Sequence, residues 1–185
     1  MAEKRLHVGC AMWTHRAWLG RSIPSSTRAG GELAAYARVV NAVEGNTTFY
    51  ASPSPSTVRR WAEAVDSEFR FMFKLPQEVT HHRKLRDIGT VVTDFLRLLE
   101  PLHDTMSPTA IQLPAAFTPD DLPVLDDFLA ELTSSLSWAV EVRHPGFFND
   151  GEVERALNDV LYRHGANRII LDSRAVFAGP RETAA

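Results

Sequence analysis

The chain is poor in cysteine, in long apolar runs and in excess positive charge. Its single cysteine, Cys10, excludes an intrachain disulfide and fits a reducing compartment. No segment stays apolar over the roughly 18 residues of a membrane-spanning helix, and the N-terminus lacks the apolar core of a signal peptide. The formal net charge of -3 gives no basic field for non-specific nucleic-acid binding. These absences predict a cytoplasmic protein in which Cys10, set in an apolar stretch, is buried and inert.

The composition is that of an ordinary globular domain. Of the 185 residues, 44% are hydrophobic and 23% are charged, which is enough to build a core and a solvated surface. No low-complexity segment or linker divides the sequence. We therefore expect one domain over residues 1–177, followed by a short polar tail over residues 178–185.

Short strand-like segments alternate with segments of helical spacing. The strand-like segments are residues 5–13, 43–50, 70–75, 109–113, 138–143 and 168–172. Between them, apolar residues recur at helical intervals, and one helix has a strong start signal, with Ser54 as N-cap and Pro55 at the first helical position. This alternation predicts an α/β fold with a parallel sheet, right-handed crossovers and a covering layer of helices.

Polar residues recur in the C-terminal halves of these strands, where parallel α/β folds assemble their active sites. The set is Glu44, Asn46, Lys74, Gln112, Glu141, Arg143 and Asp172. In the strand expected over residues 43–50, Glu44, Asn46 and Thr48 would point to one face. Each residue alone has a structural explanation, but their common position predicts one cavity. Since an unpaired buried charge is costly, we expect Lys74 and Arg143 to pair with acidic members of the set.

Four segments resemble the successive motifs of a known family. They are residues 43–50, residues 71–76 together with Thr80 and His81, residues 111–114, and residues 139–145. On these motifs, and over nearly the whole chain, the sequence resembles the DUF72 family (domain of unknown function 72). The resemblance implies a TIM-barrel-like parallel (β/α) fold without a generally agreed activity. One departure is Gly45, which stands where the family usually has isoleucine and would loosen the packing opposite Glu44.

The length is short for a closed barrel. An eight-stranded barrel takes about 250 residues, whereas this sequence has 185. We therefore expect a barrel truncated to about six strands of eight, with the remainder supplied by another chain or absent. Open first and last strands would favour self-association through their free edges.

Two carboxylates, Glu44 and Glu141, are the candidate general acid and base of a hydrolase- or isomerase-like enzyme. In this hypothesis Lys74 and Arg143 bind an anionic or sugar-like group, and His144 is a further acid/base candidate. The predicted substrate-binding residues are Trp13, Asn46, Tyr50, His81, Gln112, Arg143 and Asp172.

Two other classes of function stay open. A non-catalytic module would hold a carbohydrate or an unstacked nucleotide on aromatic side chains such as Trp13, Trp18 and Tyr50. An inactive truncated remnant would do neither. A divalent metal held by Glu44, Glu141, Asp172 and a histidine is not favoured, because the chain has no tight metal-ligand spacing. No cofactor is therefore assigned. The expected partner is a small sugar- or phosphate-containing molecule; no membrane partner is expected, and a nucleic acid stays open but is not favoured.

Overall fold

The structure, a computed structural model, describes residues 5–133, 135–148 and 151–172. The strands in this part are β1 (Gly9–Cys10), β2 (Ala42–Gly45), β3 (Arg70–Phe73), β4 (Thr109–Gln112), β5 (Trp138–Glu141) and β6 (Asn167–Arg168). The α-helices are α1 (Glu32–Tyr36), α2 (Thr47–Tyr50), α3 (Pro55–Glu63), α4 (Gly89–Leu99), α5 (Leu122–Glu131) and α6 (Glu152–Arg163). Shorter turns are the 3-10 helices η1 (Arg16–Trp18), η3 (Glu100–Thr105), η4 (Pro119–Asp121) and η5 (Pro145–Phe147), and the π-helix η2 (Glu78–His82). The predicted tail over residues 178–185 lies outside the described residues.

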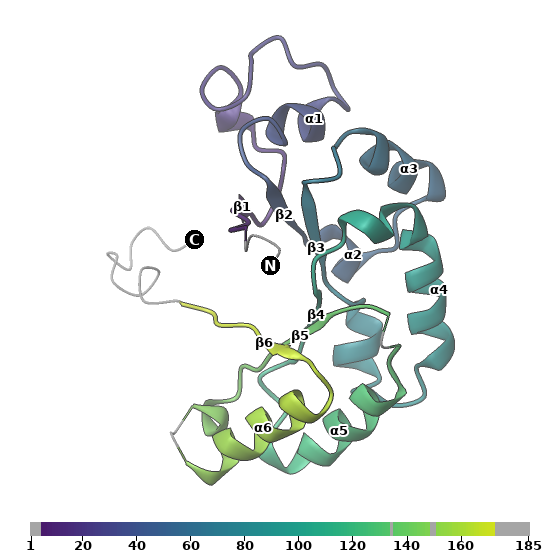
Figure 1. The fold of residues 1–185 in the computed structure, drawn as a ribbon, viewed down its shortest axis with the longest axis vertical. Helices are drawn as coiled ribbons and strands as arrows, with labels where there is room; N and C mark the ends of the chain where they lie inside the picture. Colours follow the sequence, from purple (N-terminus) through teal and green to yellow (C-terminus); the bar gives the residue numbers. More distant parts are fainter. Residues whose placement is uncertain (1–4, 134, 149–150, 173–185) are drawn as a thin grey trace.

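The strands form two three-stranded parallel sheets, in the orders β1-β2-β3 and β4-β5-β6. Isolated bridges between Phe71 and Met106 and between Lys74 and Ala110 connect β3 to β4. The Leu75 amide donates to the Ala110 carbonyl at 2.9 Å in the same connection. The six strands therefore follow one another in chain order along a curved layer, and the helices cover its convex outer side (Figure 1).

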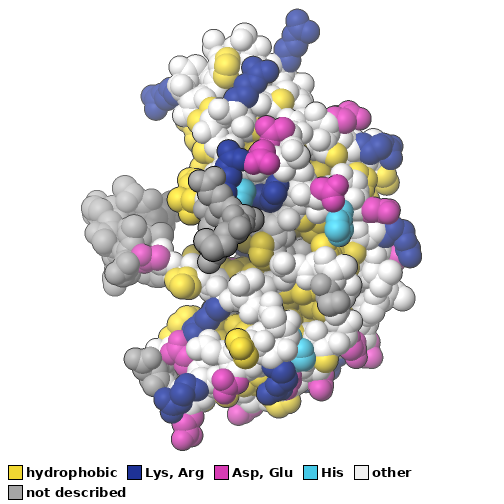
Figure 2. All heavy atoms as spheres, viewed as in Figure 1, with side chains coloured by type: hydrophobic (Ala, Val, Ile, Leu, Met, Phe, Trp, Pro, Cys, Tyr) yellow, Lys and Arg dark blue, Asp and Glu magenta, His cyan; other side chains and the backbone are white. Residues whose placement is uncertain are grey.

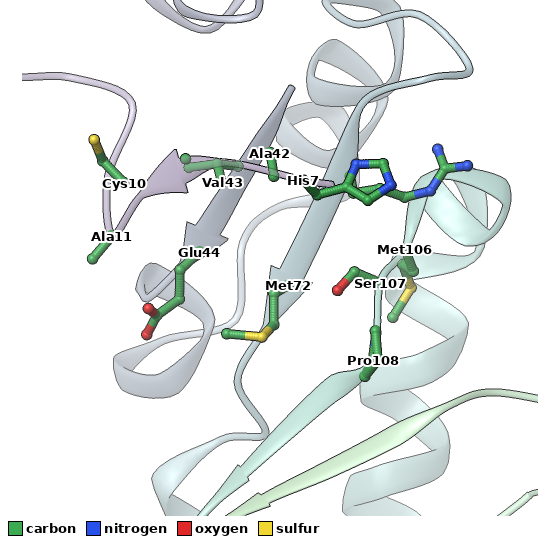
Figure 3. A pocket seen from close by; sticks show the side chains of 12 residues that line it. His7, Cys10, Ala11, Ala42, Val43, Glu44, Met72, Met106, Ser107 and Pro108 are labelled. Carbon is green, nitrogen blue, oxygen red and sulfur yellow. The ribbon is translucent and has the colours of Figure 1, made fainter. Parts of the chain in front are cut away.

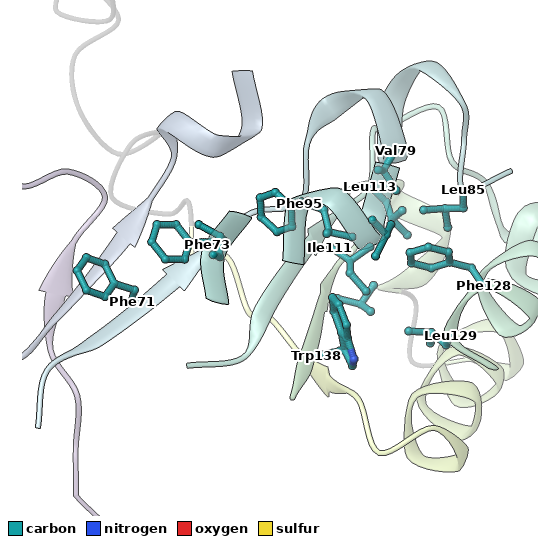
Figure 4. Close-up of a cluster of buried hydrophobic side chains, with 14 of the residues drawn as sticks. Phe71, Phe73, Val79, Leu85, Phe95, Ile111, Leu113, Phe128, Leu129 and Trp138 are labelled. Atoms are coloured by element: carbon teal, nitrogen blue, oxygen red, sulfur yellow. The ribbon is translucent and has the colours of Figure 1, made fainter. Parts of the chain in front are cut away.

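The outer face of this layer carries the hydrophobic core. Residues that pair across parallel strands point to the same face, and alternate residues point to opposite faces. The residues on the outer face of β2 to β5 are therefore the ones that pack against the helices, and Phe71, Phe73 and Ile111 are fully buried there (Figure 4). Val140 is fully buried as well. The inner face is left with small and polar side chains and with Met72.

The predicted helix signals are confirmed. The Ser54 side chain accepts a hydrogen bond from the Thr57 amide at 3.2 Å, and Pro55 is the first residue of α3. Val58 and Trp61, which the helical spacing marked as one face, are buried. These local signals were reliable because capping and amphipathic spacing act within one helix.

Several predicted strand limits are wrong. The strand expected over residues 43–50 ends at Gly45, and α2 begins at Thr47, so Asn46 and Thr48 do not continue the face of Glu44. The physical reason is the Thr48 hydroxyl, which contacts the carbonyls of Gly45 at 3.1 Å and Lys74 at 2.9 Å and holds the chain in a turn. The last strand, β6, ends at Arg168, so Asp172 lies four residues beyond it in exposed chain.

Two predictions about packing are also corrected. Cys10 is exposed rather than buried, because β1 is the first strand of the layer and, among the described strands, only β2 pairs with it. Gly45 does not loosen the packing. A Cβ atom at this position would lie 2.5 Å from Cδ1 of Phe73, so the aromatic ring occupies the space that a larger side chain would need.

Within the described ranges, none of the helices has both the length and the apolar character needed to cross a membrane.

Candidate functional site

An ion pair and a hydrogen bond connect three successive strands on the inner face. The ammonium group of Lys74 lies 2.7 Å from Oε1 of Glu44 and donates to Oε1 of Gln112, also at 2.7 Å. The side chains of Lys74 and Glu44 are 12% and 27% exposed, so the pair is largely shielded from water. The register explains the contact, since Glu44 pairs with Met72 and Lys74 follows two residues later on the same face.

A second ion pair lies on the neighbouring strand. Nε of Arg143 donates to Oε1 of Glu141 at 2.7 Å. Glu141 is the direct register partner of Gln112, and both side chains are buried, with 5% and 7% of their surface exposed. The predicted pairing of Lys74 and Arg143 with acidic residues is thus confirmed, and Glu44, Lys74, Gln112, Glu141 and Arg143 form what we call the polar cluster.

The charge of Arg143, a member of the polar cluster, acts on the imidazole of His81. Burial lowers the pKa of His81, and the positive charges of Arg143 and then His82 lower it further. Nδ1 of His81 lies 2.8 Å from the hydroxyl of the buried Thr80, and the ring packs edge-on against Phe49 at 5.1 Å. The second ring nitrogen, Nε2, has no hydrogen bond within the described part of the chain.

His144 is turned toward its own loop. Its Nδ1 accepts a hydrogen bond from the Gly146 amide at 3.1 Å, and its ring lies 6.3 Å from that of Phe147. An Nδ1 that accepts a hydrogen bond leaves the proton of the neutral ring on Nε2. His144 therefore helps to start the 3-10 helix η5, and no hydrogen bond or ion pair between described residues connects it to the polar cluster.

A cavity of about 500 Å³ lies on the inner face beside the polar cluster. Glu44 belongs to both, and its side chain projects from β2 on the same side as that of Met72 from β3 (Figure 3). The rest of the lining comes mainly from small or apolar side chains of β1, β2 and the chain before β4. The face of the molecule in Figure 2 shows acidic and basic side chains intermixed rather than one extended patch of a single sign.

Other predicted site residues are not brought into the polar cluster. Nδ2 of Asn46 donates to the Ala11 carbonyl at 3.1 Å, and the Trp13 ring packs edge-on against buried Trp61 at 5.2 Å. Tyr50 is 71% exposed and lines a different cavity, of about 640 Å³, between α2, η2 and α4. The turn at Asn46 explains why Tyr50 lies elsewhere, whereas Trp13 is held by its packing against the core.

Two residues that the sequence analysis did not assign also line the inner face. Arg70 and Met72 lie on β3 and border the 500 Å³ cavity. Both precede Lys74 at intervals of two residues, and this period-two spacing was the signal that would have found them. No group of three or more His, Cys, Asp or Glu side chains in the described ranges is arranged to hold a metal ion.

Comparison with known proteins identifies the family. Residues 7–184 match the family described as "Protein of unknown function DUF72". The chain belongs to the DUF72 family. The UPF0759 protein YecE of Escherichia coli (strain K12) is 44% identical to it over 173 residues, which cover 94% of this chain and 61% of that relative. The YecE protein of Escherichia coli O157:H7 is 43% identical with the same coverage. This DUF72 chain therefore spans less than two thirds of the length of these curated relatives.

Solved structures of DUF72 proteins share the fold. The protein from Thermotoga maritima superposes with a TM-score of 0.72 at 26% identity, over 90% of this chain and 64% of that chain. A protein from Enterococcus faecalis gives a TM-score of 0.64 at 22% identity, over 76% of this chain and 58% of that chain. These comparisons establish an α/β protein with parallel sheets in the DUF72 family. The names of these relatives state no activity, so the geometry of the site is the basis for assigning a function.

Proposed function

We propose that this DUF72 protein is a hydrolase- or isomerase-like enzyme that uses Glu44 and Glu141 as acid/base carboxylates. One observation carries the proposal: both carboxylates project from the same sheet face, and each has one oxygen fixed by a cation at 2.7 Å. A carboxylate held in this way keeps its position while its second oxygen can exchange a proton with a substrate. Lys74 and Arg143 would stabilise negative charge that develops nearby.

The proposal extends to the architecture and the location of the protein. The order of the parallel strands, with helices on the outer side, supports a TIM-barrel-like arrangement in which the polar cluster lies toward the C-terminal ends of the strands. In such folds the catalytic residues come from the ends of several strands. The single cysteine supports a reducing compartment such as the cytoplasm.

The test is turnover of chromogenic esters, glycosides and phosphate esters by the purified 185-residue chain. For the substrate with the highest rate, Glu141→Gln should lower kcat by about 10²- to 10⁴-fold, the range of general acid/base catalysis. Glu44→Gln should also lower it. Glu63→Gln, at the exposed end of α3, is the matched control and should retain the wild-type rate.

The same experiment separates the enzyme from a binding module. If the Glu141→Gln variant retains its affinity for the ligand but loses turnover, the result agrees with the proposal. Equal turnover in the wild type and both glutamine variants would contradict it. A wild-type protein that binds a carbohydrate without turning it over would favour the non-catalytic alternative.

A further inference from the structure

We infer that Gln112 and Glu141 form a donor–acceptor pair that binds a hydroxyl group of a neutral, polyhydroxylated ligand such as a sugar or a cyclitol. The inference names the ligand class of the proposed site, and it rests on the proposed function only in taking the inner face as the substrate-binding face. Its basis is the set of donors and acceptors of the polar cluster that are already used in hydrogen bonds and ion pairs within it.

Lys74 fixes the orientation of the Gln112 amide. An ammonium group only donates hydrogen bonds, so the atom of Gln112 that lies 2.7 Å from Nζ has to be the carbonyl oxygen Oε1. The amide nitrogen Nε2, with its two N–H donors, is therefore turned away from Lys74. Glu44 contacts the same ammonium group and holds it in place. Gln112 thus presents donors, and not its acceptor, to the inner face.

Glu141 presents the complementary group. Its Oε1 accepts from Arg143, which leaves Oε2 as an acceptor without a hydrogen bond among the described residues. The same holds for Nε2 of Gln112. Neither atom is among the fully buried polar atoms without a partner, so both reach the surface of the inner face. Water or a ligand can therefore contact them.

The two groups are neighbours that do not bond to each other. Gln112 and Glu141 are direct register partners on β4 and β5, so their side chains leave the sheet side by side on one face. An amide N–H and a carboxylate oxygen would form a hydrogen bond if they met, yet each side chain is held by a different cation instead. This arrangement leaves a donor and an acceptor next to each other, and a hydroxyl group, which both accepts and donates, satisfies the two together.

The charge of the polar cluster favours a neutral ligand over an anion. Its two carboxylates are matched by two cations in close ion pairs, so the cluster has no net charge. His81 adds little positive charge at neutral pH, because burial and then Arg143 lower its pKa. Within the cluster, a phosphate dianion would have to compete with Glu44 and Glu141 for the same cations, whereas Arg70 on the cavity wall donates to the carbonyls of Ser67 and Phe69. A neutral hydroxyl uses the unoccupied atoms and leaves both ion pairs intact.

The cavity that shares Glu44 with the polar cluster has room for the rest of such a ligand, while Gln112 and Glu141 lie outside its lining. Its volume of about 500 Å³ falls within the range of known small-molecule sites, and it opens beside Glu44 at the edge of the polar cluster. Its wall is mainly of small and apolar side chains, with His7, Arg70 and Ser107 among them, and would face a sugar ring while the cluster binds hydroxyl groups.

The experiment measures binding rather than turnover, by saturation-transfer NMR and titration calorimetry with D-glucose and myo-inositol, and with inorganic phosphate as the anionic probe. We expect saturable binding of at least one neutral probe. Gln112→Glu keeps an acceptor for Lys74 but removes both N–H donors, so it should weaken this binding at least about fivefold. Gln77→Glu makes the same change at the start of η2, outside the polar cluster, and should leave the affinity unchanged. If Gln112→Glu does not fold, Gln112→Met removes the same donors without adding charge.

Three results would overturn the inference: binding of phosphate in place of both neutral probes, no saturable binding of either neutral probe, or binding that Gln112→Glu leaves unchanged. The outcome is separable from that of the catalytic proposal. Binding that depends on Gln112 in a protein without turnover supports the ligand class and refutes acid/base catalysis. Turnover that depends on Glu141, together with binding that does not depend on Gln112, supports acid/base catalysis and refutes the ligand class.

Discussion

At the scale of single residues, Lys74 joins three strands because its ammonium group contacts both Glu44 and Gln112 at 2.7 Å. Its side chain is only 12% exposed, so water compensates little when a partner is removed. Loss of Lys74 would leave a shielded carboxylate and an amide oxygen without donors. Much of the expected loss in the free energy of unfolding therefore comes from these two unsatisfied groups.

Replacing Lys74 by methionine, which has similar length and no charge, should lower the free energy of unfolding by about 1–3 kcal/mol. Urea denaturation measures the change. Because the lost contact is with Glu44, the additional substitution Glu44→Gln should cost less in the Lys74→Met protein than in the wild type. Additive effects of the two substitutions would show that the pair has no energetic coupling.

Gly45 shows how one missing side chain permits a ring to pack. The Phe73 ring lies between those of Phe71 at 5.3 Å and Trp61 at 5.8 Å, and a Cβ atom on Gly45 would come within 2.5 Å of it. The fully buried ring has neighbours on both sides and cannot move away freely.

Gly45→Ala should therefore destabilise the fold by about 1–3 kcal/mol, the usual range for overpacking a core. Gly89→Ala is the control, since a Cβ atom there meets no atom within 4 Å. Phe73→Leu should make the Gly45→Ala change less costly, because the shorter side chain vacates the contact. Equal stability of the wild type and Gly45→Ala in thermal and urea unfolding would refute this packing argument.

At the scale of elements, an acidic residue on α5 ties that helix to the end of α6. Asp126 accepts a hydrogen bond from His164 at 2.5 Å and pairs with Arg163. The hydrogen bond from His164 is the largest cause that lowers the pKa of the Asp126 carboxyl, and Arg163 lowers it further against the opposing effect of burial. The folded state thus binds a proton at Asp126 less readily than the unfolded chain does.

The sign of the pH dependence follows from this lowered pKa. The contribution of Asp126 is present above the ordinary aspartate pKa of about 3.9 and is lost as the pH falls through the lower value of the folded state. Asp126→Asn should lower the free energy of unfolding by about 1 kcal/mol or less near pH 7, as is usual for partly exposed pairs. The difference from wild type should shrink toward pH 2. A constant difference from pH 7 to pH 2 in urea titrations would contradict the role of this carboxylate.

At the scale of the whole molecule, the layer of strands has two outer strands, each paired on one side within the described residues. The Ala42 amide donates to the Val8 carbonyl on the edge of the first strand that faces β2. Apolar side chains near these two strands are exposed, among them Val8 at 55% and Ile170 at 87%. Unpaired strand edges with exposed apolar side chains favour pairing with another chain.

We therefore propose that the 185-residue chain self-associates through these edges, and we expect sedimentation velocity to show oligomers at micromolar concentration. The double substitution Val8→Lys and Ile170→Lys should shift the protein toward monomer, because charged side chains oppose edge pairing. Tyr162→Lys, at an 89% exposed site on α6, is the control and should leave the distribution unchanged. A wild-type protein that sediments as a monomer would rule out this association.

The sequence by itself determined the order of strands and helices, the cap at Ser54 and the presence of Glu44, Lys74, Gln112, Glu141 and Arg143 on one face. These features depend on local hydrogen bonds and on the alternation of side chains along a strand, which the chain carries within a few residues. The pairing of the charges was also predictable, since buried charges require partners.

Only the tertiary structure decided the features that depend on atoms far apart in the chain. The strand ends at Gly45 because the Thr48 hydroxyl reaches the carbonyl of Lys74 on the next strand. The Phe73 ring fills the space that a side chain at position 45 would need, and Lys74 determines which atom of the Gln112 amide accepts its hydrogen bond. Local patterns list the groups that a site can use, whereas packing between elements fixes which of their atoms remain free, because each contact removes a donor or an acceptor.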